Sequence, residues 1–162
     1  MKLHILAVAL TALATAATAQ TSVSVGSLEH DTDLPVEVTS DTLSVANEEG
    51  QAVFDGNVVV IQGPMRLASA KLEVSYNPEE GNNEIQEMVA TGGVTFVNGT
   101  EAAESDRAIY NPEAGTLVMY DNVLLTQGAT AIAGDKLTVN LDDGTGLMEG
   151  QVRTTFQSGG NQ

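Results

Sequence analysis

A strand-and-turn unit recurs four times along this chain, and the repeat restricts the possible folds more than any other feature. One turn of each unit ends at a glycine, at Gly50, Gly81, Gly115 and Gly144, and these glycines are 31, 34 and 29 residues apart. A period of roughly 30 residues is typical of stacked architectures, in which no unit buries its apolar face alone. A second turn is expected in each unit, at Gly56-Asn57, Gly92-Gly93, Asp121-Asn122 and Gly150-Gln151.

Between these turns apolar and polar side chains alternate, most clearly in the segment from Ser40 to Gly63. Alternation bounded by Gly, Asn and Asp is typical of half-buried strands joined as hairpins. We predict an all-β antiparallel fold of roughly fourteen to sixteen strands of about five residues, because the loops are too short for parallel crossovers. Strands are expected at 36–38, 42–46, 51–55, 58–62, 65–68, 71–76, 85–90, 94–97, 107–110, 116–120, 123–127, 129–133, 136–140, 146–149 and 152–156, and 100–105 is expected to be extended.

The N-terminus has the features of a secretory signal peptide. Lys2 supplies the positive charge, residues 3–13 are mainly apolar, and Ala17-Thr18-Ala19 is a small-residue cleavage site, so we expect cleavage before Gln20. The alternative is an uncleaved membrane anchor, although the apolar run is shorter than the ~20 residues that a helical span needs. The expected organisation is a signal peptide at 1–19, a flexible leader at 20–33, a β-domain at 34–157 and a polar tail at 158–162.

Charge and cysteine content limit the partners and the cross-links of the exported chain. Without Lys2, five basic residues remain against 22 acidic ones, which is a formal charge of −17. Such a surface repels nucleic acids at long range, so nucleic-acid binding is excluded. The chain has no cysteine, so the domain must be held by sheet hydrogen bonds and apolar burial without disulfides.

The sequence offers no catalytic constellation. Both histidines lie outside the predicted β-domain, His4 in the signal peptide and His30 in the leader. The carboxylate pairs Glu79-Glu80 and Asp142-Asp143 lie in predicted turns, where acidic side chains are usually solvated. Gly92-Gly93 begins the signature of a calcium-binding β-roll, but the third glycine of that signature is missing. We therefore expect no enzyme activity, no cofactor and no metal.

One parity of the alternation gathers apolar side chains on a single face of the sheet. These residues either pack a closed core or line a groove that two splayed sheets leave for an apolar ligand. Periodicity does not separate the two interpretations, because both need one apolar face. With three Phe, three Tyr and no Trp, the composition leans toward a partly unfilled groove. The residues of this face are Val36, Val38, Leu43, Val45, Val58, Val60, Leu72, Val74, Tyr76, Phe96, Met119, Leu125, Leu137 and Val139.

Four segments of the chain form a recognisable set: residues 34–43 (LPVEVTSDTL), 54–63 (FDGNVVVIQG), 70–72 (AKL) and 134–137 (GDKL). Together they resemble the OstA-like family of periplasmic lipopolysaccharide-transport proteins, and the resemblance extends over residues 34–157. It implies an open, V-shaped antiparallel β-jellyroll, built from the repeated units, whose apolar groove takes lipid A acyl chains. It also implies a periplasmic location and no enzymatic activity.

The resemblance further implies partners and groove residues. The partners would be lipopolysaccharide, a periplasmic domain associated with an inner-membrane ABC transporter, the periplasmic domain of an outer-membrane translocon, and copies of the chain stacked head to tail. The alternatives are a structural or adhesin-like β-repeat protein, an anchored component of the same pathway, and a calcium-binding β-roll. The expected lipid-binding residues are Val36, Val38, Leu43, Val45, Val58, Val60, Phe96, Tyr110 and Met119.

Overall fold

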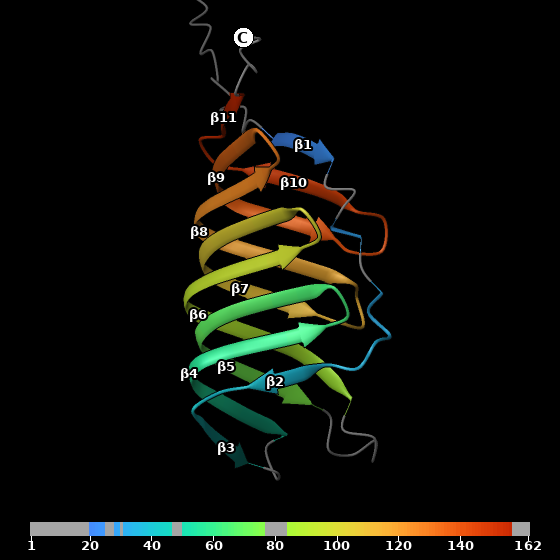
Figure 1. The fold of residues 1–162 in the computed structure, drawn as a ribbon, viewed down its shortest axis with the longest axis vertical. Helices are drawn as coiled ribbons and strands as arrows, with labels where there is room; N and C mark the ends of the chain where they lie inside the picture. Colours follow the sequence, from blue (N-terminus) through green and yellow to red (C-terminus); the bar gives the residue numbers. More distant parts are fainter. Residues whose placement is uncertain (1–19, 25–27, 30, 47–49, 77–83, 157–162) are drawn as a thin grey trace, which may run out of the picture.

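The computed structural model describes residues 20–24, 28–29, 31–46, 50–76 and 84–156. Over these residues the chain forms eleven β-strands in one sheet, and every strand pair is antiparallel (Figure 1). In the described ranges no helix is long and apolar enough to cross a bilayer. The strands are β1 (Gln20–Ser24), β2 (Glu37–Thr39), β3 (Thr42–Ala46), β4 (Gln51–Gln62), β5 (Met65–Tyr76), β6 (Ile85–Asn98), β7 (Glu101–Asn111), β8 (Thr116–Gln127), β9 (Thr130–Asn140), β10 (Thr145–Glu149) and β11 (Arg153–Phe156).

The central strands are about twice as long as the sequence predicts. The predicted turns at Gly56-Asn57, Gly92-Gly93 and Asp121-Asn122 lie inside β4, β6 and β8, where they form bulges rather than hairpins. Both residues of each pair have a positive φ, as in the tight turn of a hairpin. Here, however, the same neighbouring strand continues on both sides of the pair, so the chain bends without reversing. The prediction of fourteen to sixteen short strands is wrong for this reason.

An aspartate on the neighbouring segment caps two of these bulges. The side-chain amide of Asn57 donates a 2.8 Å hydrogen bond to Oδ2 of Asp41. The amide of Asn122 donates an equivalent 2.7 Å bond to Oδ2 of Asp106. The bulges therefore recur with the same chemistry along the sheet, and they form a continuous line that we call the bend.

The bend divides the sheet into two leaves, visible in Figure 1 as strands that fold back along one side. The first leaf contains β1, β3, β10 and the strand segments 51–55, 71–76, 85–91, 107–111, 116–120 and 136–140. The second leaf contains β2, β11 and the segments 58–62, 65–69, 94–98, 101–105, 123–127 and 130–133. One end of the sheet is thus shared by two short strands, β2 and β3. At the other end, β1 is the last strand of the first leaf and β11 is the last strand of the second.

The prediction of a flexible leader at residues 20–33 is wrong for the described part of that segment. Gln20–Ser24 form β1, which pairs with β10 at the far end of the first leaf. Leu28 is fully buried in the core. Residues 1–19, 158–162 and the Asn77–Gly81 turn lie outside the described residues, so the signal peptide and the polar tail stay predictions.

Candidate functional site

The inner faces of the two leaves carry continuous rows of apolar side chains, because residues paired directly across antiparallel strands point to the same face. A row of the first leaf passes through Leu43, Phe54, Leu72, Ala90, Ala108, Met119, Leu137 and Met148. A row of the second leaf passes through Val38, Val60, Leu67, Phe96, Ala103, Leu125 and Ile132. The space between the leaves is therefore apolar along the length of the sheet.

Five of the nine expected lipid-binding residues meet in the interior. They come from four strands and both leaves, and none is more than 2% exposed. All five belong to one cluster of buried apolar side chains. The five are Val58, Val60, Phe96, Tyr110 and Met119.

The other four lie at the end of the sheet that β2 and β3 form. Val36 and Val38 are half-buried and pack against the same cluster. Leu43 and Val45 are 54% and 53% exposed. Their cross-strand partners on β4, Phe54 and Ala52, pack against the cluster. Leu43 and Val45 therefore lie on the inner face of the sheet, as predicted. Leu43 and Val45 are exposed because β3 is the last strand of its leaf.

The opening between the leaves, opposite the bend, is lined by polar side chains. Gln62, Asn98 and Glu101 occupy the last inner-facing row of the second leaf, and all three are buried. The hydroxyl of Tyr110 on the first leaf donates a 2.7 Å hydrogen bond to Oε1 of Gln62. Burial raises the pKa of the Tyr110 hydroxyl to about 12. We call this opening the mouth.

A segment of the N-terminal chain lies across the mouth. We name it the strap, and it comprises the described residues 28–29 and 31–36 between β1 and β2. The side-chain amide of Gln62 donates two 2.7 Å hydrogen bonds to the strap, to the carbonyl oxygens of Thr32 and Leu34. The amide of Asn98 donates a 3.2 Å bond to the carbonyl oxygen of Glu29.

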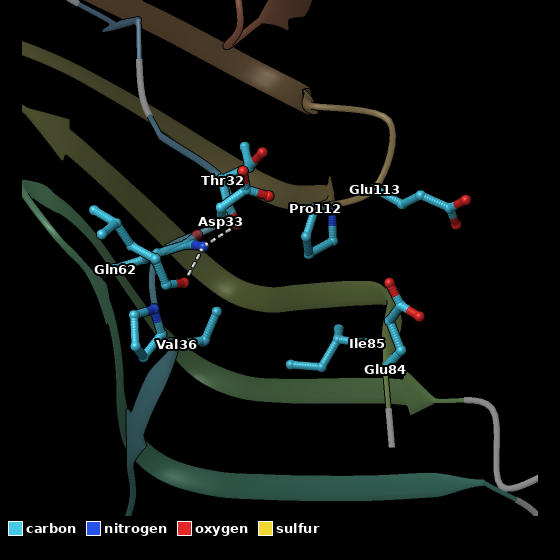
Figure 2. Close-up of a pocket in the computed structure, with 10 residues that line it drawn as sticks. Thr32, Asp33, Val36, Gln62, Glu84, Ile85, Pro112 and Glu113 are labelled. Carbon is cyan, nitrogen blue, oxygen red and sulfur yellow. Dashed lines mark hydrogen bonds between the residues drawn. The ribbon is translucent and has the colours of Figure 1, made fainter. Parts of the chain in front are cut away.

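A cavity of about 530 Å³ lies beside the strap at the mouth. Figure 2 shows Gln62 and the strap on one side of it, with Ile85 and Pro112 of the first leaf on the other. Asp33, Glu84 and Glu113 also line it, so its wall is acidic at the solvent side. Val36 and Ile85, which line the cavity, also pack against the buried apolar cluster.

The motifs that carry the family resemblance are structural. In Asp135-Lys136-Leu137, Leu137 is fully buried on the inner face, and the Lys136 ammonium lies 5.9 Å from the ring centre of Tyr120. The guanidinium of Arg107 lies 5.4 Å from the same ring centre. These cations stack outside the bend, on the face opposite the interior. The motifs therefore specify the bend and its outer surface.

Of the two carboxylate pairs, the structure describes Asp142-Asp143. Asp143 accepts hydrogen bonds from the backbone N–H and the hydroxyl of Thr145, and these bonds lower the pKa of Asp143. Asp143 therefore closes the turn before β10. Glu79-Glu80 lie outside the described residues. In the part of the chain that the structure describes, no group of three or more His, Asp or Glu side chains could hold a metal ion.

Sequence reasoning missed the strap and its partners. Leu28 stands among polar residues with no periodic pattern, so no local signal predicts its burial. Gln62 ends a predicted strand and Asn98 directly follows one, but each precedes a glycine and therefore resembles an ordinary turn residue. A polar side chain on the apolar parity of a strand was the available signal, because such a residue needs a buried partner.

Comparisons with known proteins agree with this architecture. Residues 37–145 match the protein family described as LptA/(LptD N-terminal domain) LPS transport protein. An uncharacterized protein of Rhizobium meliloti (strain 1021) is 30% identical over 144 residues, which cover 85% of this chain and 77% of that protein.

A solved structure shares the fold. It is the crystal structure of LptH from Pseudomonas aeruginosa, described as the LptA homologous periplasmic component of the conserved lipopolysaccharide transport device. It superposes with a TM-score of 0.70 at 16% sequence identity, and the match covers 79% of this chain and 99% of that one. The prediction of an open antiparallel β-jellyroll is confirmed.

Proposed function

Because the chain belongs to the LptA/LptD N-terminal-domain family of lipopolysaccharide transport proteins, we propose that it is a periplasmic carrier whose groove binds lipid A acyl chains. The family is one of transport proteins, so the function is not enzymatic. The observation that carries the proposal is the unbroken apolar lining of both leaves, from Leu43 to Met148 on the first leaf and from Val38 to Ile132 on the second.

The energetics suit a carrier. Each buried methylene contributes about 0.8 kcal/mol relative to water, so a twelve-carbon chain gains on the order of 9 kcal/mol. A bilayer offers nearly the same gain, so a groove of this kind can accept a lipid without trapping it. The chain's formal charge of −16 gives the phosphates of lipid A no attraction, and the acyl chains therefore supply the affinity.

The two ends of the sheet support head-to-tail stacking. Leu43 and Val45 on β3 are exposed at one end, and Phe156 on β11 is 74% exposed at the other. Phe156 pairs with Thr130 on β9, in the row that Gln62 and Asn98 also occupy. A second copy that adds its β3 and β2 to the end formed by β1 and β11 would cover these side chains and continue both leaves of the groove. The same edges would dock the related periplasmic domains at the inner and outer membranes.

A pair of photo-crosslinker variants tests the groove. Phe96 faces the interior, whereas Val97 is the next residue of β6 and faces outward. With the crosslinker at residue 96, we expect capture of lipopolysaccharide in cells. With the crosslinker at residue 97, we expect none. Equal capture at both positions would refute the groove, and no capture by either folded variant would favour a structural β-repeat protein.

Export is tested separately. We expect N-terminal sequencing of the protein recovered from the periplasm to begin at Gln20. An intact N-terminus in the membrane fraction would instead favour the anchored alternative.

A further inference from the structure

The strap connects opposite ends of the two leaves. Before it, β1 pairs with β10 at the end of the first leaf. After it, β2 pairs with β4 at the other end of the second leaf. The chain between them follows the long axis of the molecule (Figure 1). The strap therefore runs along the mouth of the groove rather than away from it.

The strap contacts the inside of the groove through the apolar side chains of Leu28 and Val36 and through several carbonyl groups. Leu28 is fully buried within the same cluster as Phe96 and Met119. Three strap carbonyls accept hydrogen bonds from Gln62 and Asn98, whose exposed fractions are 1% and 2%. Apolar carbon in the interior and carbonyl oxygens at the rim are also the chemistry of an ester- or amide-linked acyl chain.

This correspondence has an energetic consequence. A buried amide donor that loses its acceptor is destabilising, so Gln62 and Asn98 favour a mouth that is filled. The strap satisfies them in the lipid-free protein. An acyl chain that enters with its linking carbonyl satisfies them equally, and its methylenes replace Leu28 in the interior.

We propose that the strap is an intrachain substitute for lipid, which closes the groove when it is empty and is displaced when acyl chains enter. The inference rests on the proposed lipid-carrier function and adds its regulation. Binding and strap release are then coupled, because lipid and strap compete for the same amides and the same apolar space. The apparent affinity for lipid is proportional to the fraction of molecules whose strap is open, so it falls as that fraction becomes smaller.

An engineered disulfide tests the proposal, and the cysteine-free chain is suited to it. Ser22 on β1 and Leu147 on β10 are cross-strand partners on the outer face. The double substitution Ser22→Cys/Leu147→Cys would hold β1 on the sheet when oxidised. The matched control is Val118→Cys/Thr138→Cys, another outward-facing pair in the same leaf that does not involve the strap.

The measurement is binding of purified lipopolysaccharide to the exported protein, oxidised and reduced. We expect the oxidised strap variant to bind at least about tenfold more weakly than its reduced form, because its open fraction is smaller. The control should bind alike in both states. Equal binding by the oxidised and reduced strap variant, or equal weakening of the control, would overturn the strap's role.

A second pair of variants works in the opposite direction. Leu28→Ala removes the buried contact, whereas Leu124→Ala changes a leucine that is 37% exposed on the outer face of β8, away from the strap. We expect faster uptake of lipopolysaccharide by Leu28→Ala and an unchanged rate for Leu124→Ala; equal rates would count against the proposal. If the wild-type protein binds no lipopolysaccharide at all, the lipid-carrier function fails and the strap's role fails with it.

Discussion

The Tyr110 hydroxyl and Oε1 of Gln62 are joined by a 2.7 Å hydrogen bond that crosses the mouth from one leaf to the other. The amide nitrogen of the same Gln62 holds two carbonyls of the strap. A single buried glutamine thus links the first leaf, the second leaf and the N-terminal chain. The three hydrogen bonds determine the orientation of the Gln62 side-chain amide, because its oxygen can only accept and its nitrogen can only donate.

Removing the Tyr110 hydroxyl should destabilise the protein. Tyr110→Phe leaves Oε1 of Gln62 buried without its donor, and we expect a loss of about 1–3 kcal/mol in the free energy of unfolding. Urea denaturation followed by circular dichroism measures it. The control is Tyr120→Phe, since the Tyr120 ring stacks on cations outside the bend and keeps that contact as phenylalanine. Equal losses for the two variants would show that the mouth bond contributes nothing specific.

The raised pKa of Tyr110 predicts that the folded protein loses stability at alkaline pH. The pKa of Tyr110 is about 12 in the folded protein and about 10 in an unfolded chain. Folding favours the neutral hydroxyl. Its contribution to the free energy of unfolding is therefore complete below pH 10 and is lost as the pH rises toward 12. The lost stability is about 2–3 kcal/mol. Unfolding measured from pH 9 to pH 12 should show this decline in the wild type and a smaller one in Tyr110→Phe.

Alanine substitutions at two adjacent glycines in the bend distinguish the cost of backbone strain from the cost of a steric clash. Gly92 and Gly93 both have a φ of 83°, so alanine is strained at either position. A Cβ at Gly92 would lie 2.6 Å from Cβ of Ala70, whereas a Cβ at Gly93 would meet nothing within 4 Å. We expect Gly93→Ala to cost about 1–3 kcal/mol from strain alone, and Gly92→Ala to cost more. Thermal unfolding of both variants tests this order, which equal melting temperatures would contradict.

The exposed Phe156 should matter for association and not for folding. As a surface substitution, Phe156→Ala is expected to change monomer stability by no more than about 0.5 kcal/mol. If copies stack through β11, the variant should shift sedimentation toward monomers at concentrations where the wild type forms longer assemblies. Leu124→Ala is the matched control, because Leu124 is 37% exposed on the outer face of β8, away from both ends. A wild-type sedimentation profile for Phe156→Ala would exclude β11 from the contact.

Much of the fold was predictable because it depends on local chemistry. Period-two alternation identified the apolar face along whole strands, and the structure buries Phe96 and Met119 there as expected. Leu43 also lies on the predicted inner face, and it is exposed because β3 is the last strand of its leaf. The extended conformation expected for residues 100–105 is found from Glu101 onward, where β7 begins.

Other features were decided by partners far away in the sequence. Gly56-Asn57 has the backbone conformation of a hairpin turn. It bends β4 instead of reversing it because β5 continues alongside both halves of that strand. The burial of Leu28 is a stronger case, since the neighbouring Glu29 is held by Asn98, 69 residues away.

The sequence by itself therefore determined the strand class, the antiparallel pairing and the inner face, because alternation and turn chemistry act over a few residues. Only the tertiary structure decided that three of the four predicted second turns are bulges, and that the N-terminal segment lies across the mouth. Both depend on contacts between segments far apart in the chain. Such contacts produce no periodic pattern in the local sequence, so the sequence alone does not predict them.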